Sequence, residues 1–370
     1  MQPTWSRSRA YLLSLAAAAL IVAVAHPVRS TAQAPENVCD IRTTERVVVV
    51  GDIHGAYDQF VAILQAAGIL KGDRWAGGRS ILIQTGDVLD RGAQSRRAVD
   101  LLRRLERDAA RAGGRVYALL GNHEFMRLVG DWRYVSPGEF KAFQNGDSED
   151  LRARVHMAAA AQAEKRATTE GRRFDAAEYR QQFMKEIPLG YLEMRSAFDA
   201  MGEYGRWVRE RPTIVRVNGV LFIHGGVSEK NAALGCEGLN AAVRRDLTSL
   251  PVPAEQIAAL LPATEDGPLW YRGMARDSDD AAVPSLDATG VDRILKAMNA
   301  RAIVLGHTPV LKGGITPRFG GRVILIDTGM LNGEFFPGGV ASALEIQGTT
   351  FTAIYERGRE PVPLPALQTQ

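Results

Sequence analysis

The chain has 370 residues, with 45 lysines and arginines against 42 aspartates and glutamates, and a formal net charge of +3. Arg7, Arg9 and Arg29 all lie ahead of an expected cleavage site and no acidic residue does, so the mature chain is predicted to carry a net charge of zero. No basic excess remains to attract nucleic acid or an anionic membrane. The mature length allows one large domain or two small ones.

Residues 1–34 have the pattern of a secretory signal peptide. An apolar run follows two arginines, and small residues then offer cleavage after Ala32 or Ala34. We favour Ala32, because Pro35 directly after the second site hinders a peptidase. The apolar run is short of the roughly 20 residues that span a bilayer. We therefore expect a periplasmic or secreted protein with no stable membrane anchor, and an uncleaved N-terminal anchor is the alternative.

Three short apolar runs then indicate buried strands: 46–50, 81–85 and 116–120. Each run ends at a glycine followed by a polar residue, at equal steps of 35 residues: Asp52, Asp87 and Asn122. This step suits one strand–helix–strand unit, and the segments 57–67 and 93–111 between the runs have helical character. We expect these strands to deliver their polar residues to one edge of one sheet.

Residues 131–205 lack strand-like runs and indicate a helical insertion. The part between Lys141 and Glu186 holds nine lysines and arginines against eight acidic residues, which favours a solvated helical face over a phosphate-collecting patch. Because this insertion is large, we expect it to cap the site and to select substrates.

Strand signals return after the insertion. Asn218-Gly219 is a strong turn signal between the runs 213–217 and 220–223, which predicts a hairpin. Further runs indicate two more strands, one helix and a closing hairpin: 302–305, 323–327, 291–299, 342–346 and 350–355. Together these elements predict an α/β fold in which two β-sheets pack face to face with helices outside. The domain is expected to span residues 44–357, and residues 358–370 have the composition of a disordered tail.

The histidines outside the signal peptide and the insertion share one setting. Each of them follows an apolar run and lies beside a glycine: His54, His123, His224 and His307. Glycine lets the backbone turn sharply beside a ligand, and binding sites gather at the carboxyl ends of strands. This pattern predicts a metal site.

The ligand types allow two metal ions. Asp52, His54 and Asp87 can hold one ion, and a second can share the Asp87 carboxylate. Its remaining ligands would be Asn122, His224 and His307. Such a pair of ions can deprotonate a water molecule and bind phosphoryl oxygens. Oxygen and nitrogen ligands without cysteine fit manganese, iron or zinc, and we expect manganese ahead of the other two.

Two further residues of the motifs, Asp90 and His123, are not needed as ligands. If Asp90 hydrogen-bonds to His123 and holds it protonated, His123 can act as a general acid toward a leaving oxygen. Arg91 can grip two phosphate oxygens, and Arg272 is a second candidate for this role.

Taken together, five stretches resemble the phosphoprotein phosphatase branch of the calcineurin-like metallophosphoesterases: Gly51–Gly55, Gly86–Gly92, Gly121–Glu124, 224–226 and 306–307. The resemblance spans about Val47 to Tyr355. Three further stretches make the chain most similar to the bacterial, Shewanella-like phosphatases: 121–135, 204–207 and 267–273.

The resemblance implies the calcineurin-like metallophosphoesterase fold, two metals, direct attack by a metal-bridging hydroxide and no phosphoenzyme. It implies the same six metal ligands, acid catalysis by His123 oriented by Asp90, and phosphate contacts for Arg91, Asn122 and Arg272. One departure concerns the loop 327–330, where eukaryotic members carry a tyrosine-containing loop. This departure leaves the substrate preference open.

The leading expectation is a phosphatase of phosphoserine, phosphothreonine or phosphotyrosine proteins. The alternative is a diadenosine tetraphosphatase or another small-molecule phosphoesterase. Asp90 favours phosphomonoesters, because that related group has a small residue there. A non-enzymatic metal-binding module is disfavoured, because every motif residue is intact. Cys39 and Cys236 can pair in an exported protein or remain free thiols, since spacing alone fixes no geometry.

Overall fold

The computed structural model describes residues 37–276, 284–311 and 314–362. The expected signal peptide and its cleavage site lie outside these residues. The chain divides into two units. The helical unit is Phe143–Met194, and the main body consists of Val38–Ala142 and the chain from Arg195 onward.

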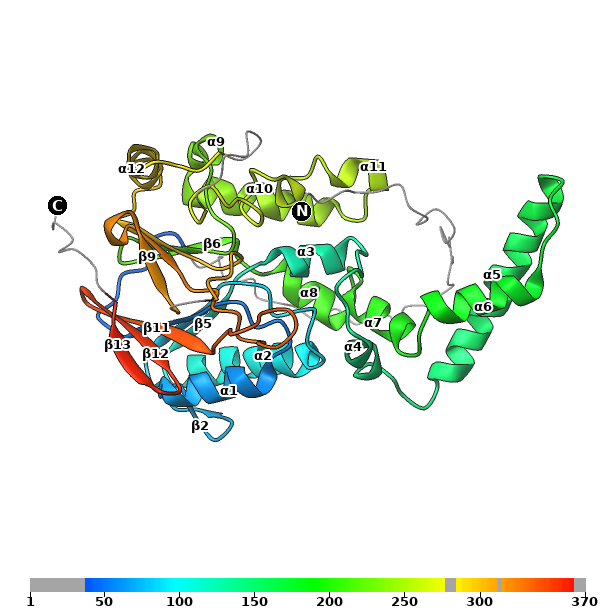
Figure 1. Cartoon of the computed structure of the whole chain (residues 1–370), viewed down its shortest axis with the longest axis horizontal. Coiled ribbons are helices and arrows are strands. Elements are labelled where there is room, and N and C mark those ends of the chain that lie inside the picture. Colours follow the sequence, from blue (N-terminus) through cyan, green and yellow to red (C-terminus); the bar gives the residue numbers. More distant parts are fainter. Residues whose placement is uncertain (1–36, 277–283, 312–313, 363–370) are drawn as a thin grey trace, which may run out of the picture. The chain divides into compact units, whose positions relative to one another are not determined.

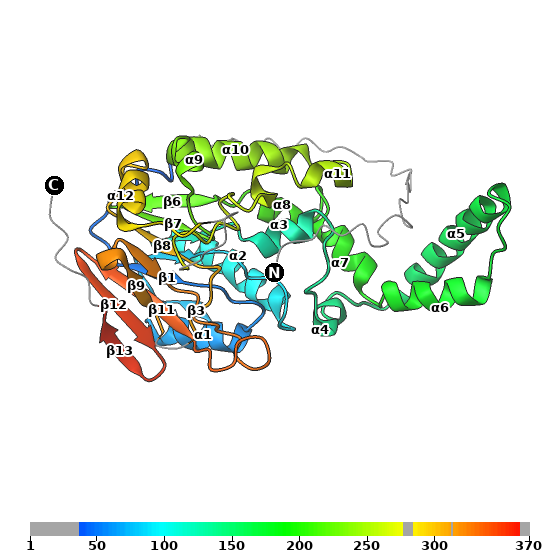
Figure 2. The ribbon, with the colours of Figure 1, turned by 45° about the horizontal axis from the view of Figure 1, so that its top comes forward.

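The first sheet of the main body has six strands (Figures 1 and 2). Their order across the sheet is β13 (Gly358–Pro361), β12 (Thr350–Tyr355), β11 (Ser342–Gln347), β1 (Val47–Val50), β4 (Ile81–Gln84) and β5 (Arg115–Ala118). The strands β1, β4 and β5 are parallel and in register, because Val50 faces Gln84 and Gln84 faces Ala118. Their carboxyl ends therefore meet at one edge, as the 35-residue steps predicted.

The second sheet has five strands, in the order β6 (Ile214–Val217), β7 (Val220–Ile223), β8 (Ala302–Leu305), β10 (Val323–Leu325) and β9 (Thr316–Arg318). Strands β6 and β7 form the predicted hairpin, with Asn218 and Gly219 both at positive φ. Strands β7, β8 and β10 are parallel, so His224 and Gly306 follow adjacent strand ends. A separate two-stranded hairpin pairs β2 (Leu70–Lys71) with β3 (Arg74–Trp75).

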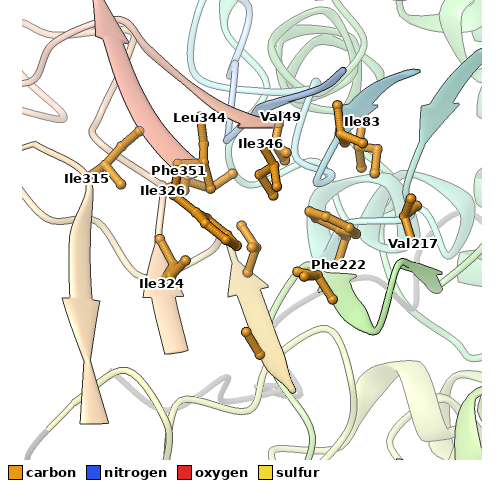
Figure 3. Close-up of a cluster of buried hydrophobic side chains, with 14 of the residues drawn as sticks. Val49, Ile83, Val217, Phe222, Ile315, Ile324, Ile326, Leu344, Ile346 and Phe351 are labelled. Carbon is orange, nitrogen blue, oxygen red and sulfur yellow. The ribbon is translucent and has the colours of Figure 1, made fainter. Parts of the chain in front are cut away.

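The main core lies between the two sheets (Figure 3). Alternate residues of the first sheet, such as Val49 and Ile83, meet Phe222 and Ile324 of the second. The opposite face of the second sheet is covered by α10 (Gly235–Ser249) and α12 (Ala288–Ala297). The helices α1 (Tyr57–Ala66) and α2 (Ser95–Arg111) pack on the first sheet through their apolar stripes. The predicted arrangement of two sheets between helices is confirmed.

Between β5 and β6 the chain forms helices and no strand. They are α3 (Asn122–Leu128), α4 (Pro137–Lys141), α5 (Ser148–Thr169), α6 (Ala176–Glu186), α7 (Tyr191–Phe198) and α8 (Glu203–Arg209). The separate helical unit covers fewer residues than the expected insertion 131–205, because side chains of α8 form hydrogen bonds with α2 of the main body. Tyr204 donates to Asp100 and Trp207 donates to Glu106. In the described part of the chain, no helix has the length and apolarity needed to cross a membrane.

The helical unit has a small core of its own. Ala159, Phe183 and Ile187 are buried together there. Two contacts tie the beginning of the unit to its end: Gln144 donates to the Leu189 carbonyl (3.1 Å), and Ser148 donates to Glu193.

The two cysteines form a disulfide between Cys39 and Cys236. This bond joins the segment ahead of β1 to α10, which packs on the second sheet. Ile41 continues the contact by forming a bridge with Val217 of β6. The pairing that the sequence left open is therefore present.

The expected tail begins later than residue 358. Gly358–Pro361 forms the edge strand β13 on β12, and the buried Val362 donates its backbone N–H to Phe351. A proline is tolerated here because an edge strand has one side without a partner. Proline content therefore gave the wrong boundary, and residues 363–370 lie outside the described part.

Candidate functional site

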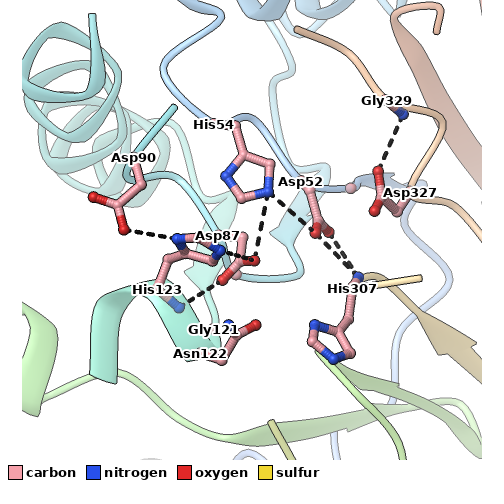
Figure 4. Close-up of polar contacts among 12 residues, drawn as sticks. Asp52, His54, Asp87, Asp90, Gly121, Asn122, His123, His307, Asp327 and Gly329 are labelled. Atoms are coloured by element: carbon pink, nitrogen blue, oxygen red, sulfur yellow. Dashed lines mark hydrogen bonds and ion pairs between the residues drawn. The ribbon is translucent and has the colours of Figure 1, made fainter. Parts of the chain in front are cut away.

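The loops that leave the strands of both sheets converge at one place (Figure 4). Several non-glycine residues on them have left-handed φ angles: His54 (48°), Asp87 (57°), Asp90 (71°), Arg91 (67°) and His307 (63°). Each such residue costs on the order of 1–3 kcal/mol and clusters of them are typical of functional sites. Backbone contacts hold the turns, since Ile53 and His54 both donate to the Asp87 carbonyl at 2.9 Å.

Two glycines of the motifs are required because a carboxylate oxygen lies too close to them for a side chain to fit. A Cβ on Gly121 would lie 2.3 Å from Oδ1 of Asp87, and one on Gly306 would lie 2.4 Å from Oδ1 of Asp52. Both distances are far below van der Waals contact. These glycines therefore let the carboxylates come close to neighbouring strand ends.

The predicted ligands lie together and are buried. The ligand atoms of Asp87, His224 and His307 are within 4.8 Å of one another, and so are those of His54, Asp87 and His123. Asp87 belongs to both groups. Asp52 lies 3.9 Å from Nε2 of His54 and accepts the backbone N–H of His307.

The hydrogen bonds of two imidazoles set their tautomers. Nδ1 of His54 contacts the Leu89 carbonyl and Nδ1 of His224 contacts the Thr85 carbonyl, both at 2.9 Å. A carbonyl only accepts, so Nδ1 carries the proton and Nε2 of a neutral ring offers a lone pair. Nε2 of His224 is 2.8 Å from Oδ1 of Asn122 and 3.3 Å from Asp87. Lone pairs facing one another in this way fit a shared cation.

The pKa shifts of the predicted ligands also favour cation binding. Burial and then the charge of His123 lower the pKa of His54 to about 3, and burial and then Arg272 lower the pKa of His307 well below its usual value. Burial followed by Asp327 and Asp87 raises the pKa of Asp52 well above its usual range. Neutral imidazoles and crowded carboxylates are what divalent cations need. Nε2 of His307 is buried and has no hydrogen-bond partner in the described part of the chain, which also fits an ion.

His123 is held differently from these ligands. Its Nδ1 lies 2.6 Å from Oδ2 of Asp90, and its backbone N–H donates to Asp87 at 2.9 Å. Burial alone would lower the pKa of His123, but the Asp87 charge and the Asp90 hydrogen bond outweigh it and raise that pKa. The ring is therefore biased toward the protonated form, with Nε2 on the side away from Asp90.

Arg91 lies among aromatic rings. Its guanidinium carbon is 4.8 Å from the ring centre of Phe336, 5.5 Å from that of Tyr134 and 5.9 Å from that of Phe335. Its Nε is buried and has no hydrogen-bond partner among the residues that the structure describes. The ring of His123 is 5.1 Å from that of Tyr134. We call Tyr134, Phe335 and Phe336 the aromatic collar.

Arg272 lies beside the second ligand group. It donates to the His307 carbonyl at 2.9 Å and to Oγ1 of Thr308 at 3.0 Å. Burial and then the neighbouring Arg276 lower its pKa to about 10, which leaves it cationic at neutral pH.

The structure adds residues that the sequence did not single out. Glu124 accepts the backbone N–H groups of Asp87, Val88 and Gly121 at 2.8–2.9 Å and so shapes the turn that carries Asp87. Asp327 is a buried carboxylate whose pKa is raised to about 6, first by burial. Glu124 belongs to the Gly121–Glu124 stretch, and Asp327 belongs to the loop 327–330 that differs from the eukaryotic members. The sequence pattern assigns neither residue a role, because six other residues already supply the metal ligands.

The fold and this group of residues define a metal-dependent phosphoesterase, and comparison with known proteins names its family. The calcineurin-like phosphoesterase family model matches residues 45–311. The chain belongs to this family, which depends on two metal ions, and it is a hydrolase of phosphoester bonds. The predicted family is confirmed.

A named phosphatase and a solved structure support the Shewanella-like branch. The chain is 27% identical over 318 residues to Shewanella-like protein phosphatase 2 of Arabidopsis thaliana, covering 82% of this chain and 75% of that protein. It is 33% identical over 296 residues to an uncharacterized protein of Schizosaccharomyces pombe, covering 77% and 73%. The crystal structure of a cold-active protein-tyrosine phosphatase from a psychrophilic Shewanella species has a TM-score of 0.63 at 26% identity, covering 87% of this chain and 81% of that one.

Proposed function

We propose that this protein is a phosphomonoesterase that removes phosphate from proteins, with phosphotyrosine as its preferred substrate. The observation that carries the proposal is the aromatic collar around Arg91, directly beside His123. A guanidinium binds phosphate oxygens in pairs, so a phosphate held by Arg91 would place its ester group next to these rings.

The chain's residues divide the work. Asp52, His54 and Asp87 would hold one divalent ion, and Asp87, Asn122, His224 and His307 would hold the other, with manganese as our first expectation. When bound, two such ions lower the pKa of water and neutralise phosphoryl charge. Arg91, Asn122 and Arg272 hold the phosphoryl group. His123, oriented by Asp90, donates its proton to the leaving oxygen.

The collar favours an aromatic leaving group. Tyr134 is 41% exposed and Phe335 is 50% exposed, which is unusual for large apolar side chains. The planar ring of a phosphotyrosine would cover them, and aromatic pairs gain about 0.5–1.5 kcal/mol beyond the area that they bury. A phosphoserine has a single methylene group between its backbone and its phosphate. It has no ring to pack on the collar, so the collar rings would stay exposed to water.

The relatives give independent support. One similar solved structure is a protein tyrosine phosphatase, and the named homologues are protein phosphatases. The absence of a basic excess in the mature chain agrees with recognition of a local phosphorylated group, not of nucleic acid.

We also propose a periplasmic or secreted location. The charged and apolar pattern of residues 1–34 supports export, and the Cys39–Cys236 disulfide supports an oxidising compartment. Cell fractionation with N-terminal sequencing of the purified protein tests this. Recovery from the cytoplasm with an intact N-terminus would overturn it.

The function is tested by loading the purified protein with Mn²⁺ and assaying matched phosphotyrosine, phosphoserine and phosphothreonine peptides beside a dinucleoside polyphosphate. We expect the highest kcat/KM on phosphotyrosine. Tyr134→Ala and Phe335→Ala should each reduce the ratio of kcat/KM for phosphotyrosine to that for phosphoserine by about 2- to 10-fold, given the energies above. Leu234→Ala, at a similarly exposed position, should leave this ratio unchanged. Faster cleavage of the dinucleoside polyphosphate would instead favour a small-molecule hydrolase.

A further inference from the structure

Both carboxylate oxygens of the buried Asp90 are engaged. One faces Nδ1 of His123, and the other accepts from a terminal nitrogen of Arg127. A carboxylate with one partner can rotate about its last bond, whereas a second partner fixes which oxygen faces the imidazole. Arg127 therefore restricts the group that orients the proton donor.

Glu139 contacts both Arg127 and Asp90. It accepts from the same Arg127 nitrogen at 3.1 Å and from the backbone N–H of Asp90 at 3.1 Å. Asp90 is thus held through its side chain by Arg127 and through its backbone by Glu139. The second contact acts at a residue whose φ of 71° is left-handed and needs support.

The guanidinium of Arg127 also sits between aromatic rings. It lies 5.0 Å from the ring centre of Trp132 and 5.1 Å from that of Phe198. Arg127 and Glu139 are both buried. The guanidinium of Arg127 contacts two acidic side chains, Asp90 and Glu139, which fix its position. An arrangement of this kind is rigid and specific in its geometry.

We propose that Arg127 and Glu139 are positioning residues for the proton donor: they hold Asp90 so that His123 points Nε2 at the leaving oxygen. This inference rests on the proposed function. The contacts of Arg127 and Glu139 with Asp90 lead to the proton donor, so their loss should affect protonation of the leaving group more than binding of the phosphate.

The decisive measurement is the dependence of rate on the leaving group. Aryl phosphates range from dinitrophenyl phosphate, whose phenolate leaves without a proton, to phenyl phosphate, whose oxygen needs one. In Arg127→Met we expect kcat for phenyl phosphate to fall about 10–100-fold, part of the 10²–10⁴ that a general acid contributes. For dinitrophenyl phosphate we expect a change below about threefold. KM and bound metal should stay at wild-type levels.

A matched control separates positioning from stability. Arg211 is a largely buried arginine, with its side chain 12% exposed, that pairs with a glutamate, Glu106, and lies 4.5 Å from a tryptophan ring centre. Arg211→Met should lower the melting temperature as Arg127→Met does, without any leaving-group effect. The double variant Arg127→Met/Glu139→Gln removes one charge of each sign. It replaces the single variant in the leaving-group measurement if the single variant does not fold.

A His123→Asn background completes the test. If Arg127 acts through His123, then Arg127→Met should add no further loss there. An equal loss on all esters, an undiminished loss in the His123→Asn background, or no loss at all would overturn the inference. A wild-type protein that cleaves none of the esters would contradict the proposed function itself, so the two failures are distinguishable.

Discussion

Asp87 and His123 are neighbours with different expected tasks. Asp87 belongs to both candidate metal groups, whereas His123 belongs to one of them and turns its Nδ1 toward Asp90. We expect Asp87→Asn to lose both metals, because the amide has no negative charge to share between two ions. We expect His123→Asn to keep the metals and to lower kcat by about 10²–10⁴, the contribution of a general acid. Metal analysis of the two purified variants checks this division, and equal metal loss in both would contradict it.

Arg91 should contribute to both binding and turnover. Among the described residues its side chain contacts the aromatic collar and forms no ion pair, so its guanidinium can pair with a phosphate. We expect Arg91→Ala to raise KM and lower kcat, and Arg91→Lys to recover only part of the loss, since lysine cannot form two parallel contacts. Steady-state kinetics with para-nitrophenyl phosphate measures this. Arg133→Ala, an exposed arginine paired with Asp131, is the control, and an Arg91→Ala variant with wild-type kinetics would remove Arg91 from the site.

The strand ends were predictable because their signals are local. Apolar runs that stop at Gly-Asp or Gly-Asn mark β1, β4 and β5 directly, and Asn218-Gly219 marks the hairpin. The short strands β9 and β13 were not predicted, since Thr316–Arg318 and Gly358–Pro361 each contain a proline and no apolar run. Their pairing depends on partner strands distant in sequence.

The metal ligands were accessible from the sequence because each belongs to a motif, whereas their supports were not. Arg127 sits on a helix whose pattern indicates an ordinary charged position, yet it is buried between two carboxylates. Glu139 comes from another helix, and nothing in the spacing of the two residues predicts that they meet. Such contacts arise only from tertiary packing.

The disulfide should stabilise the element that it anchors. It closes a loop with a sequence separation of 197 residues, and loops of this size give the larger stabilisations among disulfides. We expect Cys39→Ser/Cys236→Ser to lower the melting temperature by roughly 3–8 °C, from about 2–5 kcal/mol in a domain of this size. Specific activity at low temperature should be unchanged, because Cys39 and Cys236 are not among the residues of the site. Calorimetry with and without reductant tests this, and an unchanged melting temperature would contradict it.

At the scale of the whole molecule, the helical unit should be separable from the chemistry. Its core is its own, and the contact between Gln144 and Leu189 brings its two ends together. We expect that joining Asn145 to Leu189 with a short glycine–serine linker will leave the rate on para-nitrophenyl phosphate within about threefold, the range of a mild perturbation. Rates on phosphoproteins should fall if the unit selects substrates. Equal loss on both kinds of substrate would contradict this separation.

The helical unit is flanked in the chain by two residues of the main body that contact Arg127. Glu139 lies on α4, which ends just before the unit, and Phe198 lies at the end of α7, just after it. Both residues touch Arg127. The segments on both sides of the unit therefore carry contacts to the residue that orients Asp90, so a deletion of the unit must leave both of these segments intact.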